Sequence, residues 1–322
     1  MIINNPKKTP NQQRIKPTEV LYVEDDPDDL YLVQSYLSEA EELSVALSHA
    51  PTITKAKPKL KTESVDLILL DLSTGSKAGL DTLQEMIDFL RQIDQHPPII
   101  ILTGDTNIAT GENAISMGAA DYLPKREANR FTISRIIRFA LERQRLVDEL
   151  RFRAQHDELT GLLNRSESMR RCRSLLEHCR RTPMDLYFGI LDLDDFKPIN
   201  DQYGHLIGDE LLRVVGSRLK QHSRQTDMAG RLGGDEFLMV WNHVPTEKKI
   251  QVMSNKLKTA LEKPVTLMHN GQTLELAVGF SMGLVKYSPP DSLKKVLTLA
   301  DAAMYQCKKE GGGCNVVGKS EH

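Results

Sequence analysis

The sequence lacks three features, and each absence excludes a class of protein. No apolar run is long enough to span a membrane, and the amino terminus carries no signal-peptide pattern. The formal net charge of the 322 residues is only −2, which argues against binding to nucleic acid or to a membrane surface. The 4 cysteines include no Cys-x-x-Cys spacing, so they predict reduced packing residues rather than disulfides. We therefore expect a cytoplasmic protein.

A chain of this length predicts two domains, each with its own core. Residues 1–17 are rich in Asn, Lys, Gln and Pro and predict a disordered tail. We expect a first domain over residues 18–130, a linker helix over residues 131–155 and a second domain over residues 156–322.

The first expected domain contains four short apolar segments, at residues 20–23, 65–70, 98–102 and 121–124. Strands rich in Ile and Leu that alternate with helical segments predict a parallel sheet between helices. Functional groups then collect at the carboxyl edge of the sheet. The polar residues that follow these strands are Glu24, Asp25, Asp71, Thr103 and Lys125.

Such a set predicts a phosphoacceptor site with Asp71 as the nucleophile. Asp25, Asp71 and the backbone carbonyl of Ser73 would hold Mg²⁺, while Thr103 and Lys125 would hold the aspartyl phosphate. The alternative is the same fold in a form that is never phosphorylated.

The order and spacing of these residues resemble the receiver domain of two-component response regulators, over residues 18–130. The resemblance implies a doubly wound, flavodoxin-like fold, phosphorylation of Asp71 and a sensor histidine kinase as partner. Two departures stand out. The loop after Asp71 lacks the usual Pro-Gly turn, and Lys125 is followed by Arg126 rather than Pro.

Residues 131–155 carry apolar positions at alternating spacings of four and three. Two overlapping seams are present, one of Ile133, Ile137, Ala140, Gln144 and Val147, the other of Ile136, Ala140, Val147, Leu150 and Ala154. The pattern predicts one long helix that pairs as a coiled coil. The alternative is that its first half packs on its own receiver domain.

In the second domain, the stretch Gly233–Phe237 (Gly-Gly-Asp-Glu-Phe) lies between two apolar segments, residues 228–232 and 237–241. A Gly-Gly pair in that position predicts a tight β-hairpin turn. The two carboxylates on the turn, Asp235 and Glu236, suit a divalent metal ion. The alternative is a hairpin with a solvated acidic edge.

A second polar region precedes this hairpin. An apolar strand over residues 186–191 ends at Asp192, and residues 200–205 predict a polar loop before a helix that begins near Gly208 or Asp209. Asn, His and Asp side chains there supply the directional donors and acceptors that recognise a purine. Alternatively, Asp209 caps the helix and His205 is a surface residue.

Five ordered motifs together resemble the GGDEF family of diguanylate cyclases, from about Gln155 to Val317. They are residues 157–165, the Asp192 segment, residues 200–209, the Gly-Gly-Asp-Glu-Phe turn and residues 300–308. The resemblance implies an α+β fold of the nucleotidyl-cyclase (palm-like) type. It also implies a homodimer that condenses two GTP into cyclic di-GMP and two pyrophosphates.

The resemblance also assigns roles to residues. The family's ligands for Mg²⁺ or Mn²⁺ fall on Asp192, the backbone carbonyl of Leu193, Asp235 and Glu236. Its phosphate contacts fall on Lys197 and Lys308, its guanine contacts on Asn200 and Asp209, and a nucleotide contact between those two on His205. Either Asp235 or Glu236 would activate the attacking hydroxyl.

Two further details bear on regulation and rate. Arg224 and Asp227 match the RxxD inhibitory site of the family at its usual spacing, where they would bind the product; the alternative is an ordinary surface pair. Gly312 stands where the family usually has Arg, which predicts that a phosphate contact is missing.

The sequence thus predicts a diguanylate cyclase controlled by phosphorylation of Asp71 and inhibited by its product. The competing hypothesis is a catalytically inactive cyclic di-GMP receptor, and a third is altered nucleotide use.

Overall fold

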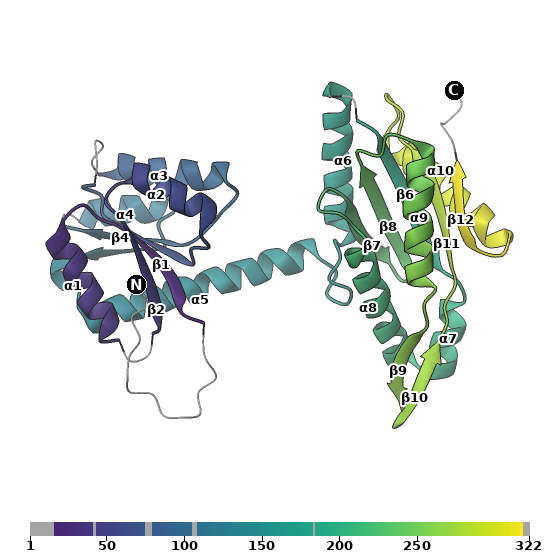
Figure 1. Ribbon diagram of the computed structural model, residues 1–322, viewed down its shortest axis with the longest axis horizontal. Helices are drawn as coiled ribbons and strands as arrows, with labels where there is room; N and C mark the ends of the chain where they lie inside the picture. Colours follow the sequence, from purple (N-terminus) through teal and green to yellow (C-terminus); the bar gives the residue numbers. More distant parts are fainter. Residues whose placement is uncertain (1–15, 41–42, 75–78, 105–107, 183, 318–322) are drawn as a thin grey trace. The chain divides into compact units, whose positions relative to one another are not determined.

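The computed structural model describes residues 16–40, 43–74, 79–104, 108–182 and 184–317. The chain forms two compact units, Met1–Glu149 and Leu150–His322 (Figure 1). The predicted disordered tail lies outside the described residues, apart from its last two. Within the described part of the chain, no helix is both long enough and apolar enough to cross a membrane.

The first unit contains a parallel sheet of five strands in the order β2-β1-β3-β4-β5. All carboxyl ends therefore lie at one edge, as the sequence predicts. β2 is the strand that the apolar runs did not reveal, because its buried residues alternate with partly exposed ones. The strands are β1 Thr18–Val23, β2 Val45–Ala50, β3 Leu67–Leu70, β4 Ile99–Thr103 and β5 Asp121–Pro124.

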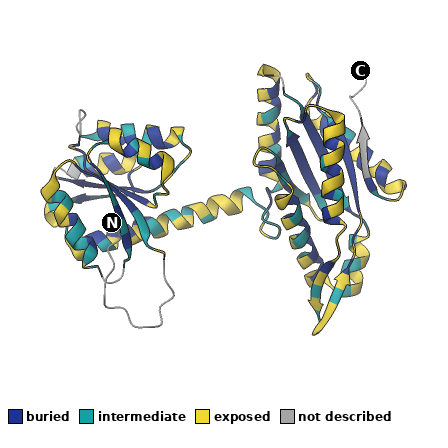
Figure 2. Ribbon diagram, in the orientation of Figure 1, coloured by how far each residue is buried: buried dark blue, intermediate teal, exposed yellow. Residues whose placement is uncertain are grey.

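Helices cover both faces of this sheet, so the flavodoxin-like fold is confirmed. α2, α3 and α4 build one core, while α1 and α5 build the other. Figure 2 shows the buried strands between helices with exposed outer faces. The helices are α1 Pro27–Ser38, α2 Ile53–Thr62, α3 Leu80–Gln92, α4 Ile108–Met117, the short 3₁₀ helix η1 Lys125–Glu127 and α5 Arg130–Gln155.

α5 is the predicted long helix, but the start of its first seam does not face a partner. Ile133, Ile136, Ile137 and Ala140 are buried in the core of the first unit. A coiled coil through this half is therefore wrong, and packing on the receiver is confirmed. Both arrangements use the same apolar spacing, so periodicity alone could not separate them.

The second unit has a five-stranded sheet in the order β12-β11-β6-β8-β7, with a separate β9-β10 hairpin. β6 is central and antiparallel to both neighbours, and the predicted α+β class is confirmed. The strands are β6 Leu186–Leu193, β7 Met228–Gly233, β8 Glu236–Asn242, β9 Val265–His269, β10 Gln272–Leu276, β11 Phe280–Lys286 and β12 Gly313–Val317.

Helices again lie on both faces of this sheet. α6 and α10 pack against one face, and α8 and α9 against the other. The helices are α6 Arg165–Arg181, α7 Phe196–Tyr203, α8 His205–Gln221, α9 Glu247–Leu261 and α10 Leu293–Lys309.

Two local expectations in this unit are wrong. The polar loop predicted over residues 200–205 lies mostly in α7, and α8 begins at His205 rather than near Gly208. The two helices are separated only by Gly204, whose φ of 84° ends the first helix. The buried strand predicted to carry Asp192 at its end is confirmed, since β6 ends at Leu193, one residue beyond Asp192.

Candidate functional site

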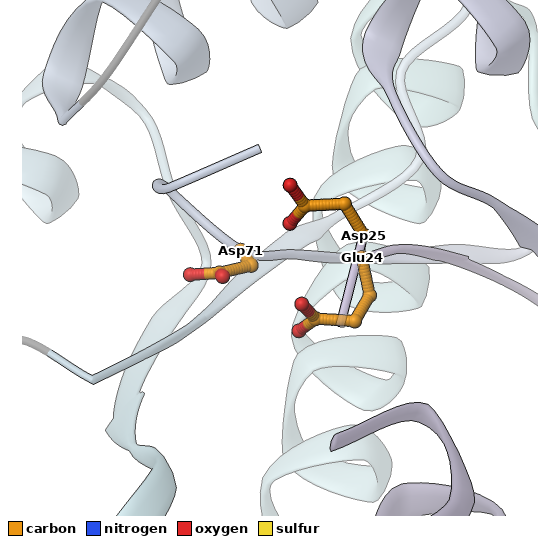
Figure 3. A group of neighbouring side chains, drawn as sticks. All are labelled: Glu24, Asp25 and Asp71. Carbon is orange, nitrogen blue, oxygen red and sulfur yellow. The ribbon is translucent and has the colours of Figure 1, made fainter. Parts of the chain in front are cut away.

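Three carboxylates meet at the carboxyl edge of the first sheet. Glu24 and Asp25 follow β1, and Asp71 follows β3 (Figure 3). Among the residues that the structure describes, they form the one group of metal-ligand side chains whose oxygen atoms all lie within 4.8 Å of one another. Such a group suits a divalent cation, because oxygen ligands would offset its charge.

Glu24 is the buried member of this group. Its carboxylate accepts hydrogen bonds from the Tyr22 hydroxyl at 2.7 Å and the Asp26 N–H at 3.1 Å. Burial and the Glu24 hydrogen bond raise the pKa of Tyr22 well above its usual value, which keeps the hydroxyl a donor. The Tyr22 hydroxyl and the Asp26 N–H therefore hold the Glu24 carboxylate in place.

Lys125 joins the carboxylates from the end of β5. Its Nζ lies 2.6 Å from Asp29 Oδ2, 2.8 Å from Glu24 Oε2 and 3.0 Å from Asp71 Oδ2. Burial alone would lower the pKa of Lys125, but the hydrogen bonds to the three carboxylates outweigh it and raise this pKa. Asp29 was not among the predicted site residues.

The remaining predicted residues of this edge lie close by in the fold. Thr103 ends β4 and is buried. The backbone N–H of Ser73 donates to Asp71 Oδ1 at 3.3 Å. Residues 75–78 of the loop after Asp71 lie outside the described residues.

The second acidic group lies where β6 meets the β7–β8 hairpin. Asp192 and Glu236 are paired in register across β6 and β8, and Asp235 lies on the turn before β8. Gly233 and Gly234 adopt φ values of 141° and 56°, so the predicted glycine turn is confirmed. The ammonium group of Lys308, on α10, contacts the Asp192 carboxylate.

Negative charge accumulates at this second group. Burial and the charge of Asp192 raise the pKa of Asp235. Burial, Asp192, Asp301 and Asp235 together raise the pKa of Glu236. The ammonium group of Lys308 offsets this repulsion only in part, and a bound cation would relieve it further.

The glycine turn is held by an arginine that the sequence did not single out as a site residue. The Arg231 guanidinium donates to the Gly234 carbonyl at 2.7 and 2.9 Å and to the Asp157 carboxylate at 3.1 and 3.2 Å. Asp157 in turn accepts from the N–H and hydroxyl of Thr160. The motif that follows α5 is therefore tied to the acidic turn.

The predicted purine contacts lie on α7 and α8. Asn200 Oδ1 is buried and has no hydrogen-bond partner among the described residues. A Cβ atom at Gly208 would lie 1.9 Å from that oxygen, so only glycine allows this approach. His205 is exposed and Asp209 partly exposed on α8, and Lys197 is exposed on α7.

The β9–β10 hairpin supports this region. The rings of Tyr203, at the end of α7, and His269 lie edge to face with centroids 5.9 Å apart. No pattern in the sequence predicts this contact.

The family described as "Diguanylate cyclase, GGDEF domain" matches residues 154–314, half of the chain. The chain belongs to the GGDEF family. A second description, "Response regulator receiver domain", matches residues 20–137, so both predicted resemblances are confirmed.

Two curated relatives share this similarity. The chain is 35% identical to diguanylate cyclase DgcN of Escherichia coli over 58% of this chain and 48% of that protein. It is 26% identical to response regulator PleD of Caulobacter vibrioides over 87% of this chain and 63% of that protein. The chain thus covers less than two thirds of either relative.

A solved structure supports the fold of the GGDEF unit. It holds the coiled coil and GGDEF domain of DgcB from Caulobacter crescentus in complex with c-di-GMP, with a TM-score of 0.52. The identity is 24%, over 58% of this chain and 99% of that chain.

The departure from the GGDEF pattern at Gly312 has a structural cause. Its φ is 87°, and an added Cβ would lie 2.8 Å from Asp194 Oδ2. The Ser281 hydroxyl holds that carboxylate at 2.8 Å. The position therefore has no room for a side chain unless Asp194 moves.

Arg224 and Asp227 of the RxxD motif lie in a turn just before β7, at the opposite end of the hairpin from the glycine turn. Asp227 accepts from the backbone N–H of Arg224 at 3.0 Å and of Asn242 at 3.3 Å. The Arg224 guanidinium is exposed and lies 3.3 Å from Met253 Sδ. The carboxylate thus serves the turn, while the guanidinium faces solvent.

Proposed function

We propose that this chain is a diguanylate cyclase controlled by phosphorylation of its receiver. The receiver would comprise residues 18–130, the signalling helix residues 131–155 and the cyclase residues 156–322. The observation that carries the proposal is the acidic group of Asp192, Asp235 and Glu236, whose negative charge Lys308 offsets only in part.

The acidic group supports nucleotidyl transfer. Asp192, Asp235, Glu236 and the Leu193 carbonyl would hold Mg²⁺ or Mn²⁺, which supplies charge neutralisation on the phosphates. The 3′-oxygen of one GTP attacks the α-phosphorus of a second, and the bond to the leaving pyrophosphate breaks. The hydroxyl proton would pass to Asp235 or Glu236.

The helices α7 and α8 would recognise guanine. Asn200 offers a buried amide oxygen without a partner in the described structure, and Asp209 offers a carboxylate for the N1–H and N2–H₂ donors. His205 would contact the nucleotide between them. Lys197 and Lys308 would contact phosphate, and the Lys308 ammonium has N–H donors beyond the one that Asp192 accepts.

The reaction needs two GTP sites facing each other, so the active form would be a homodimer. Phosphorylation of Asp71 by a sensor histidine kinase would change how receivers pair, and α5 would transmit that change. Mg²⁺ held by Asp25, Asp71 and the Ser73 carbonyl would neutralise the incoming phosphoryl group, and Thr103 with Lys125 would bind it. Cyclic di-GMP would inhibit at Arg224 and Asp227, where each Asp227 oxygen accepts one backbone N–H and can accept a further hydrogen bond from guanine.

The test is product formation from GTP and Mg²⁺, with and without beryllofluoride, which mimics an aspartyl phosphate. We expect cyclic di-GMP to form and its rate to change with beryllofluoride. Asp71→Asn should remove that response and leave basal synthesis. An equal rate of product formation with and without beryllofluoride would show that the receiver does not control the cyclase.

A silent cyclic di-GMP receptor is the second candidate, favoured by Gly312 in place of the family's Arg. Binding of cyclic di-GMP without any synthesis, in either the presence or absence of beryllofluoride, would select it. Competition between GTP and ATP tests nucleotide choice, and Asp209 favours GTP.

A further inference from the structure

Three carboxylates share the ammonium group of Lys125, and Asp29 makes the shortest of the three contacts, 2.6 Å. An ammonium group has three N–H donors. Asp29, Glu24 and Asp71 therefore engage all of them. A phosphoryl group on Asp71 can take over the contact that Asp71 itself makes, but it gains a second hydrogen bond from Lys125 only if Glu24 or Asp29 gives up its own.

Glu24 is a poor candidate to release the lysine. Its side chain is fully buried, at 0% exposure. Its carboxylate is held in place by the Tyr22 hydroxyl and the Asp26 N–H. Losing the ammonium would leave a buried charge with hydrogen bonds from neutral groups only, which is unfavourable.

Asp29 is able to release the lysine at lower cost. Its side chain is 30% exposed, so water can replace the ammonium group. It also lies in the first turn of α1, where the helix dipole favours a negative charge.

The other acids near the start of α1 do not share this role. The Asp26 carboxylate caps the helix by accepting from the Asp28 N–H at 2.8 Å. The Asp28 side chain is exposed. Asp28 therefore offers a matched control in the same helical turn.

We propose that Asp29 is a positioning residue that competes with a phosphoryl group for Lys125 and thereby favours the unmodified receiver. This rests on the proposed phosphorylation of Asp71. Because Asp29 and Asp71 contact the same nitrogen atom, a phosphoryl group on Asp71 also brings negative charge close to Asp29. Repulsion adds to the competition, and a neutral residue at position 29 removes both effects.

The first test titrates the full chain with beryllofluoride in the presence of Mg²⁺ and measures binding by calorimetry. Asp29→Asn should bind about three- to tenfold more tightly than wild type. Asp29→Glu, which keeps the charge, and Asp28→Asn should bind like wild type. Equal or weaker binding by Asp29→Asn would overturn the proposal.

A second measurement separates this inference from the proposed phosphorylation. Nitrogen-15 spectra of the lysine ammonium groups report on Lys125 directly, with its signal assigned by Lys125→Arg. The signal should shift in Asp29→Asn and stay in place in Asp28→Asn. If no variant binds beryllofluoride, the phosphoacceptor function fails, and an unshifted Lys125 signal in Asp29→Asn would overturn the role of Asp29 as well.

Discussion

The two acidic sites differ in how their charge is balanced. In the receiver, Lys125 contacts three carboxylates and its pKa is raised. In the GGDEF unit, Lys308 contacts Asp192, while the pKa values of Asp235 and Glu236 are raised by burial and by neighbouring carboxylates. In the first site one ammonium group is shared by three carboxylates, whereas in the second the ammonium contacts one carboxylate and the pKa values of the other two are raised.

This difference matches two kinds of task. A resting receiver must be stable until it is modified, so internal contacts that satisfy its acids favour the unmodified state. A nucleotidyltransferase must bind a cation together with a triphosphate. Carboxylates that the protein does not pair with its own cations are available to bind that metal ion. Carboxylates and a single lysine therefore have different tasks in the two units.

The largest expected effect comes from replacing one carboxylate in each acidic site and comparing the two variants. Asp235→Asn should lower cyclic di-GMP synthesis by at least about 100-fold, because a ligand for the cation is lost. Product binding at Arg224 should persist. Asp71→Asn, the matched change in the receiver, should leave basal synthesis within about twofold, because its site does no chemistry on GTP. Comparable losses in both variants would contradict the assignment of separate tasks.

The next effect concerns Gly312. Restoring the family's residue with Gly312→Arg should destabilise the cyclase unit by about 2 kcal/mol, because φ is positive and Asp194 occupies the space. Thermal unfolding measures the loss. Adding Asp194→Ala should recover part of it by removing the clash but not the backbone cost. A stable, faster Gly312→Arg enzyme would show that the turn rearranges.

Local signals explain what the sequence predicted. The strand that leads to Asp71 is a continuous apolar run, and the glycine turn requires positive φ at two adjacent residues. Each is a property of a few neighbouring residues. These local signals are sufficient to predict the sheet of the first unit and the acidic turn of the second.

Contacts between distant residues were beyond such signals. Lys125 and Asp29 are 96 residues apart, and Arg231 and Asp157 are 74 apart, with no periodic pattern to link them. The helix α7 was missed for a different reason. Its packed face is short and its remaining residues are polar, so composition alone predicted a loop.

A smaller effect tests how the cyclase turn is held in place. Arg231→Ala should lower kcat by about tenfold, because the guanidinium that links the Gly234 carbonyl to the Asp157 carboxylate is lost. Arg213→Ala, on the exposed face of α8, should leave kcat unchanged. Steady-state kinetics distinguish the two, and equal kcat values for both variants would refute the role of Arg231.

The smallest effect concerns Glu167, a buried acid away from both sites. Hydrogen bonds from Arg170 and Arg171 lower its pKa to about 2, from a usual 4.5. The folded pKa lies below the unfolded one, so this stabilisation is present above about pH 4.5 and is lost as the pH falls towards 2.

The full shift corresponds to about 3 kcal/mol, but the arginines are 65% and 44% exposed, so screening reduces it to about 1 kcal/mol. Glu167→Gln should therefore be less stable than wild type at pH 7 by about that amount, and the gap should narrow as the pH falls below 4.5. Denaturant unfolding at several pH values measures the gap. Glu177→Gln, on the exposed side of α6, should show none; a constant gap for Glu167→Gln would mean that packing, not charge, explains its effect.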